Sequence, residues 1–287
     1  MAERRVSFLD VVDKGASKVF FIAISLAILF LSILLINVTF SGWQRLTPQF
    51  LDSFPSSDPA KAGLKSALWG SVWVVGVATL IAMPLGVASA LYLTEFSENE
   101  RLKKLVYFNL TNLAGVPSVV FGLVGLSLLV YNLQLGRSVL AGAIVLAFLV
   151  LPVVIISASE AIRAVPELHK LGAYSLGATK VQVVRHVILP QALPAILTGG
   201  ILSISRAIGE AAPLLVISGL LFIRDVPNSV FDPFTVLPLQ IFNWIGRPFP
   251  EFRELASAGI IVLLGVLILM NLVAIILRAK LQRRVVE

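Results

Sequence analysis

The chain has 287 residues, of which 57% are hydrophobic and 14% are charged, and its formal net charge is +7. Soluble domains carry charge at about 25% of their positions, so this composition excludes an ordinary soluble protein and indicates a chain that crosses a bilayer several times. The positive charge does not indicate nucleic-acid binding, because Lys and Arg flank long apolar runs, as topology signals do. The absence of cysteine excludes disulfides and thiolate metal sites.

Six long apolar runs predict six transmembrane helices, since a helix needs about 20 residues to cross a bilayer. The runs are too long and continuous for barrel strands, so we expect an all-α polytopic membrane protein. The first run follows a polar stretch and precedes no small-residue cleavage pattern, which predicts a retained span rather than a signal peptide. The runs are 19–40, 66–93, 106–130, 139–158, 194–222 and 256–277.

The basic residues predict that both termini lie in the cytoplasm. With that orientation the inner segments carry about twice as many Lys and Arg residues as the outer ones, as the positive-inside rule requires. The inner residues are Arg4, Arg5, Lys14, Lys18, Arg101, Lys103, Lys104, Arg163, Lys170, Lys180, Arg185, Arg278, Lys280, Arg283 and Arg284. Trp43, Trp69 and Trp244 fall near predicted outer boundaries, where interfacial tryptophans are expected.

Helix-breaking residues interrupt three of the spans. Pro84 lies in the second run, residues 115–118 (Gly-Val-Pro-Ser) in the third, and Pro152 in the fourth. Proline kinks a helix, and a bundle tolerates the kink because neighbouring helices satisfy the freed backbone groups. Structural bundles contain such kinks as well, so these residues favour a transport path only slightly.

The inner segment 160–194 is predicted to form a helix-turn-helix on the cytoplasmic face. It is amphipathic and mixes basic residues with small ones. Pro166 can start a helix and Gly177 can end it, with Ala178 and Thr179 opening the next helix. Two prolines then precede the fifth span.

The spacing in this segment resembles the signature loop of ABC-transporter permeases, in which a Gly is followed after nine residues by a β-branched residue, one further residue and Leu-Pro. That resemblance implies a short helix that docks on an ATPase subunit and transmits its motion. The usual Glu-Ala-Ala of the family is Leu-Gly-Ala at 171–173 here, so the acidic residue is missing while the apolar ridge remains. The residues that the resemblance assigns to this coupling loop are Gly172, Ala173, Gly177, Ala178, Val187, Leu189 and Pro190.

The chain contains no G-x-x-x-x-G-K-[ST] motif. The nearest approach runs from Gly172 to Gly177, and Ala178 and Thr179 follow it where a phosphate-binding loop needs Lys and then Ser or Thr. Without that Lys nothing reaches the β- and γ-phosphates. We therefore expect a transport subunit that is not an enzyme and that depends on an ATPase encoded as a separate chain.

Arg206 and Glu210 are the two charged residues inside the fifth run. Being four apart on the predicted helix, they lie on one face and are expected to pair. A charge at the bilayer centre costs roughly 2.5–3.5 kcal/mol on insertion scales, so neither should face lipid. One interpretation is a pair that only locks helix packing. The other is that Arg206 faces the substrate pathway as an oxyanion ligand, with Glu210 holding it and moderating its field.

Three further stretches strengthen the second interpretation. Residues 205–215 and 114–122 resemble the equivalent stretches of phosphate-specific ABC permeases, and residues 234–244 look like the A-type of the two homologous permease subunits. The resemblance runs from about residue 66 to the C-terminus. It implies a type I ABC permease-like fold and assigns substrate passage to the positions that match here, Arg206 and Glu210.

These expectations define two parts of the chain and a set of partners. Residues 1–65 would hold the cytoplasmic N-terminus, the first transmembrane helix and an external linker, and residues 66–287 the permease core with five transmembrane helices and the coupling loop at 159–193. The resemblance implies an importer of inorganic phosphate in the cytoplasmic (inner) membrane. Its partners would be a second, C-type permease, an ATP-binding cassette dimer and an external phosphate-binding protein. We expect no cofactor, metal ion or nucleic acid.

Other functions remain open at the level of sequence. Sulfate or molybdate could replace phosphate, because a single Arg does not distinguish tetrahedral oxyanions by charge. A secondary transporter driven by an ion gradient would use Arg206 and Glu210 as a proton relay, although the chain shows no internal repeat. A non-transporting scaffold would need neither residue for transport.

Overall fold

The computed structural model describes residues 2–219 and 222–286, with side chains described for 16–219 and 222–280. Within these residues the secondary structure is helical, apart from a single isolated β-bridge between Ser138 and Pro233. Five helices are long and apolar enough to cross a membrane, and a bent pair of shorter helices can form a sixth span. The prediction of an all-α protein with about six spans is confirmed.

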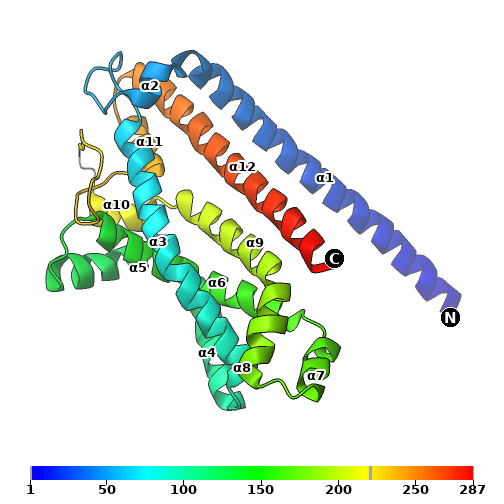
Figure 1. Cartoon of the computed structure of the whole chain (residues 1–287). Coiled ribbons are helices and arrows are strands. Elements are labelled where there is room, and N and C mark those ends of the chain that lie inside the picture. Colours follow the sequence, from blue (N-terminus) through cyan, green and yellow to red (C-terminus); the bar gives the residue numbers. More distant parts are fainter. Residues whose placement is uncertain (1, 220–221, 287) are drawn as a thin grey trace.

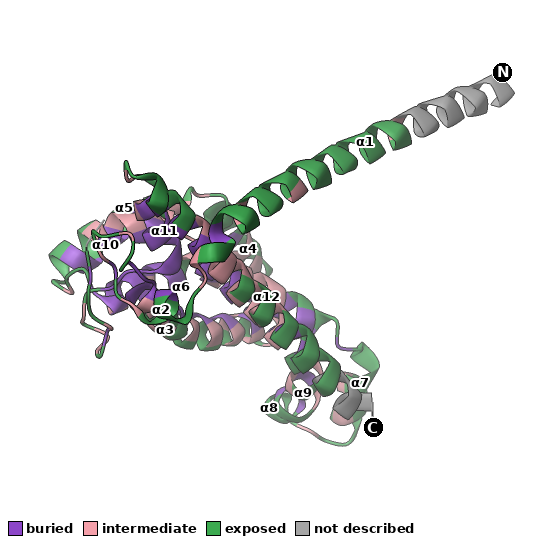
Figure 2. Cartoon of the chain, turned by 90° about the horizontal axis from the view of Figure 1, so that it is seen from above, coloured by how far each residue is buried: buried purple, intermediate pink, exposed green. Residues whose placement is uncertain are grey.

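Four of the predicted spans correspond to single long helices. They are α1 (Ala2–Gly42), α3 (Lys65–Leu91), α6 (Val139–Arg163) and α12 (Pro250–Val286). Figure 1 shows the end of α1 and the start of α12 side by side near the short helix α2 (Pro48–Asp52), from where the two helices diverge. Seen from above, α1 projects away from the bundle, and most of its described residues are exposed (Figure 2).

The centre of the bundle is α6, because more of its length is buried than that of any other span described. Small residues allow its neighbours to approach closely, as in other membrane bundles. At Gly86 of α3 an added Cβ would lie 2.5 Å from the side chain of Val154 on α6. At Gly200 of α9 (Leu189–Ile208) it would lie 2.4 Å from Met83 of α3. The helices α3, α6 and α9 therefore pack as one unit.

The end of the bundle that carries α2 is closed by an apolar cluster. Phe50 and Leu64, which flank the connection between α2 and α3, pack with Trp244 of α11 (Leu237–Ile245) and Phe252 of α12. The ring centroids of Phe50 and Trp244 are 5.8 Å apart. Trp244 has no exposed surface, so the expectation that it lies at the membrane interface is wrong. It fills the space between helices instead.

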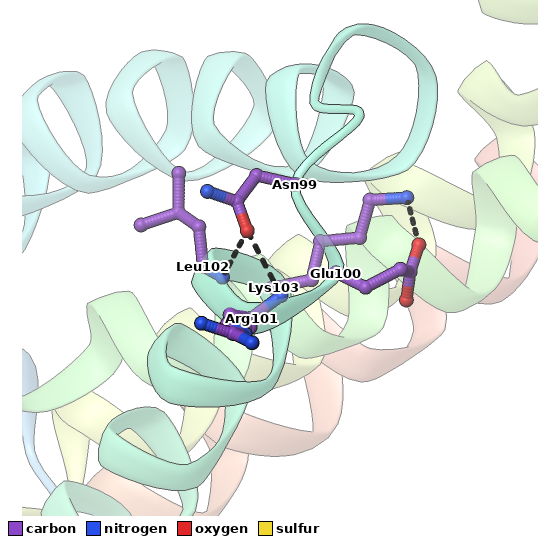
Figure 3. Close-up of polar contacts among 5 residues, drawn as sticks. All are labelled: Asn99, Glu100, Arg101, Leu102 and Lys103. Atoms are coloured by element: carbon purple, nitrogen blue, oxygen red, sulfur yellow. Dashed lines mark hydrogen bonds and ion pairs between the residues drawn. The ribbon is translucent and has the colours of Figure 1, made fainter.

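The third predicted span is not one helix. It consists of α4 (Glu100–Ala114) and α5 (Ser118–Gly125), with a π-helical turn to Asn132, and the two halves are bent by 97°. The start of α4 is fixed by Asn99, whose side-chain oxygen accepts hydrogen bonds from the backbone N–H groups of Arg101 and Leu102 (Figure 3). The break has a local cause, since Pro117 would clash with the carbonyl of residue 113 in a continuous helix.

The fifth predicted span, 194–222, is wrong at both ends. The helical run begins with α8 (Lys180–Val183), passes through a π-turn at Val184–Ile188 and ends with α9 at Ile208. A separate helix, α10 (Ala212–Ser218), follows, and residues 220–221 lie outside the described part of the chain. Pro213 explains the early end, because it lacks the N–H that a continued helix would use and clashes with the preceding turn.

The two broken spans meet each other. At Gly122 of α5 an added Cβ would lie 2.7 Å from the carbonyl oxygen of Pro213 and 2.8 Å from its Cα, so α5 and α10 are in backbone contact. Both helices lie side by side at mid-height of the bundle (Figure 1).

Replacing Gly122 with Ala is expected to destabilise the protein by about 1–3 kcal/mol, because the backbone of Pro213 cannot move aside as a flexible side chain would. Gly76→Ala in α3 is the matched control, since no atom lies within 4 Å of the position that an added Cβ would take and Ala favours a helix. The midpoint of thermal unfolding in detergent should fall for G122A and stay level or rise for G76A. Equal midpoints for the two variants would contradict the close contact.

Candidate functional site

A cavity of about 160 Å³ lies where the two broken spans meet α6. A single buried water needs roughly 10–15 Å³, so the space is large enough for a small hydrated ion. The end of α4 and the start of α5 form one wall, α6 a second, and the end of α9 a third. The polar side chains that line it are Ser118, Ser203, Arg206 and Glu210.

Each of these polar residues is placed by a helix end or a helix face. Arg206 lies in the last turn of α9, where a cation interacts favourably with the helix dipole. Ser203 is three residues earlier and therefore on the same face, and Ser118 is the first residue of α5. Glu210 lies in the short break between α9 and α10. The breaks therefore bring both charged groups to the cavity.

The expected ion pair between Arg206 and Glu210 is wrong. Neither residue takes part in the salt bridges found among the described side chains, which are defined by N–O distances of at most 4.0 Å. The physical reason is that α9 ends at Ile208, so the two residues are not one helical turn apart on a common face. The structure still brings them together, because both line the same cavity.

The cavity can hold an anion by charge and hydrogen bonding. The guanidinium of Arg206 is permanently charged and can donate two parallel hydrogen bonds to an oxyanion. Its side chain is exposed on this single chain, and the carboxylate of Glu210 is half-buried. Since Glu210 does not neutralise Arg206 by direct contact, the guanidinium donors are available to a ligand. Sequence reasoning missed Ser203, although its spacing of three residues from Arg206 is a usable signal.

The predicted coupling loop forms a second site at the opposite end of the bundle from α2 (Figure 1). Helix α7 (Glu167–Ser175) starts directly after Pro166, as predicted. It ends at Ser175, and Gly177 closes the turn that follows: its φ of +81° allows Gly177 N–H to bond to the carbonyl of Tyr174 and Ala178 N–H to that of Ala173. Thr179 then caps α8 through reciprocal bonds with Gln182. The helix-turn-helix prediction is confirmed.

The structure brings together four of the predicted coupling residues. Ala173, Gly177, Ala178 and Val187 line a shallow open groove of about 420 Å³ between α7 and the π-turn. Gly172 lies on α7 away from neighbouring atoms, and Leu189 and Pro190 begin α9 outside the groove. Beside the groove α7 exposes a set of apolar side chains, with Leu176 90% exposed. These side chains are Leu168, Leu171, Tyr174 and Leu176.

Two polar contacts that the sequence did not predict hold α7 against the bundle. Lys170 Nζ lies 2.8 Å from Glu95 Oε1, on the π-turn Tyr92–Phe96 that continues α3, and His169 Nδ1 lies 2.8 Å from Gln191 Oε1 on α9. Lys170 and Glu95 are 75 residues apart in the sequence, so no local pattern could reveal this pair. Among the described residues, no group of three or more His, Asp or Glu side chains is arranged to hold a metal ion.

A family model described as "Binding-protein-dependent transport system inner membrane component" matches residues 82–287. Two curated relatives match most of the chain. "Probable ABC transporter permease protein YqgI" of Bacillus subtilis is 29% identical, over 92% of this chain and 94% of the relative. "Phosphate transport system permease protein PstA 1" of Mycobacterium tuberculosis is 34% identical, over 86% of this chain and 79% of the relative.

The fold is also similar to that of a solved transporter structure. A chain from "Inward facing conformations of the MetNI methionine ABC transporter" aligns with a TM-score of 0.61 at 14% identity. The alignment covers 74% of this chain and 93% of that chain. At this identity the likeness concerns the arrangement of helices alone.

Proposed function

The chain belongs to the family of binding-protein-dependent transport system inner membrane components, and we propose that its transported substrate is inorganic phosphate. Membership makes the chain a multi-pass permease subunit of an ABC importer and not itself an enzyme. It also implies ATPase and binding-protein partners. The observation that carries the phosphate proposal is the cavity in which Arg206, which forms no ion pair among the described side chains, lies beside Ser118, Ser203 and Glu210.

The chemistry of the cavity supports an oxyanion. A guanidinium matches two oxygens of a phosphate group, and the hydroxyl of Ser118 can donate to another. The hydroxyl of Ser203 donates to the carbonyl of Gly199 and keeps its acceptor capacity. Glu210 lies within the same cavity and reduces the positive potential, so an anion would be bound weakly enough to leave. The M. tuberculosis relative carries phosphate transport in its name, which supports phosphate over other oxyanions.

The proposed division of roles follows the two sites. Residues 66–287 form the permease core, and residues 1–65 add the first span and an external linker. The loop 159–193 is the point at which the ATPase docks, and it lies on the cytoplasmic side together with both termini. The path itself opens toward the face on which Arg206 is exposed, where a homologous C-type permease would complete it.

Reconstitution tests the substrate directly. The chain, its permease partner, the ATPase and the binding protein are placed in liposomes, and uptake of labelled phosphate, sulfate and molybdate is compared. ATP-dependent uptake of phosphate is expected to exceed that of the other two oxyanions. Uptake driven by a proton gradient without the ATPase would instead identify a secondary transporter, and preference for sulfate or molybdate would reject the phosphate assignment.

Replacing Leu176 with Asp is expected to weaken binding of the ATPase by roughly 10- to 100-fold, since burying a leucine contributes about 1.5–3 kcal/mol. The side chain is 90% exposed on this chain and therefore available to a partner. Leu51→Asp is the matched control, because Leu51 is exposed at the outer end of the bundle. Co-purification of the ATPase with the permease dimer measures the effect. Equal recovery with L176D and L51D would contradict docking at α7.

A further inference from the structure

An ion pair joins α7 to the distant helix α3. Lys170 Nζ and Glu95 Oε1 are 2.8 Å apart, and each side chain is only 12% exposed. In every other ion pair among the described side chains, one partner is at least 48% exposed. Salt and water screen such exposed pairs strongly and a buried pair much less. Among these ion pairs, the electrostatic attraction between Lys170 and Glu95 is therefore the least screened.

The Lys170–Glu95 ion pair connects α7 to α3, which the backbone contacts of α7 do not do. Within the described residues, the main backbone contacts of α7 are with α8 and the π-turn 184–188, which follow it in the chain. His169 ties it to Gln191 at the start of α9. Glu95 lies on the π-turn Tyr92–Phe96 that continues α3, and Lys170 reaches it from the middle of α7.

Helix α3 leads from this pair to the walls of the cavity. Its Met83 packs on α9 at Gly200, and its Gly86 faces Val154 of α6 with no room for a Cβ. The helices α6 and α9 both line the cavity, and α9 carries Arg206. Tightly packed helices move as rigid bodies, so a displacement at the inner end of α3 reaches both walls.

We propose that the Lys170–Glu95 ion pair transmits movement of α7 to α3, and so couples the ATPase to the helices around the cavity. This inference rests on the proposed docking of the ATPase at α7. Separating the two partners would leave a charge largely shielded from water, which is costly, whereas apolar surfaces can slide past each other. The pair therefore keeps α7 and α3 together when α7 is pushed.

The assembled importer in liposomes, with inorganic phosphate as substrate, tests the inference. The readouts are stimulation of ATP hydrolysis by the phosphate-loaded binding protein and phosphate taken up per ATP. Glu95→Gln should reduce the stimulation by roughly fivefold or more, in the range of measured couplings between sites, with the amount of assembled complex unchanged. Glu95→Lys and Lys170→Glu should each reduce the stimulation of ATP hydrolysis more than Glu95→Gln does, because like charges then face each other. The double variant E95K/K170E should restore most of the stimulation.

The control is Glu100→Gln, which breaks the Glu100–Lys103 pair (Figure 3), an exposed contact within α4. It should leave the stimulation unchanged. Equal stimulation in E95Q and the unmodified importer would overturn this inference and leave the proposed function standing. The same holds if the variants lose assembled complex in proportion to their loss of activity, or if the double variant does not recover stimulation. Absence of stimulation in the unmodified importer would reject the proposed function instead.

Discussion

Replacing Arg206 with Gln is expected to reduce phosphate uptake by roughly 10- to 150-fold, because a hydrogen bond to a charged group contributes about 1.5–3 kcal/mol. The variant removes the permanent charge from the cavity while keeping a side chain of similar reach. Since Arg206 is not ion-paired among the described side chains, its loss leaves no buried carboxylate without a partner. The fold and the assembly with partner subunits should therefore be retained.

The measurement is labelled phosphate uptake at equal amounts of assembled importer. Phosphate uptake by Arg206→Lys should lie between that of R206Q and that of the unmodified importer, since an ammonium keeps the charge but loses the planar fork. Arg101→Gln is the control for removal of a positive charge, because Arg101 is exposed on α4 and does not line the cavity. Full uptake by R206Q would show that Arg206 serves packing alone.

Replacing Gly177 with Val is expected to uncouple ATP hydrolysis from transport. The backbone of Gly177 has φ +81°, a conformation that costs a residue with a Cβ roughly 1–2 kcal/mol and a β-branched residue more. No atom lies within 4 Å of the position its Cβ would take, so the penalty comes from the backbone and not from crowding. The turn that sets the angle between α7 and α8 is then strained, and the docking helix loses its orientation.

Phosphate taken up per ATP hydrolysed is the readout, and it should fall while basal hydrolysis persists. Gly136→Val is the matched control, because Gly136 also has a positive φ, of +66°, and no atom within 4 Å of the position of an added Cβ, but lies in the connection before α6 and not in the segment 159–193. It should lower stability to a similar degree without changing the ratio. A normal ratio in G177V, or an equal loss in G136V, would contradict a specific role of the turn.

Short-range patterns predicted the parts of the structure that depend on neighbours in the chain. Apolar runs located α1, α3, α6 and α12, because burial in lipid needs only a sufficient length of apolar residues. Pro166 and Gly177 marked the ends of α7 correctly, because capping is decided within one helical turn. The helix-turn-helix of this segment was predictable for the same reason.

Prolines within the predicted spans break the helix in two places. Pro117 divides the third span and Pro213 ends the fifth, whereas Pro84 and Pro152 lie inside continuous helices. The sequence does not separate these cases, because the cost of a proline depends on whether neighbouring helices satisfy the backbone groups that it frees. Here α5 and α10 pack on each other and stabilise both breaks.

The sequence by itself determined that this is a helical membrane protein without a phosphate-binding loop motif, and it located the turn at Gly177. The roles of Arg206, Glu210 and Gly177 in transport stay predictions. Only the tertiary structure decided that Arg206 and Glu210 share a cavity without pairing, and that Lys170 contacts Glu95. Helix length and caps arise from residues a few positions apart. Cavities and buried ion pairs arise from segments far apart in sequence, whose meeting depends on the packing of the whole bundle.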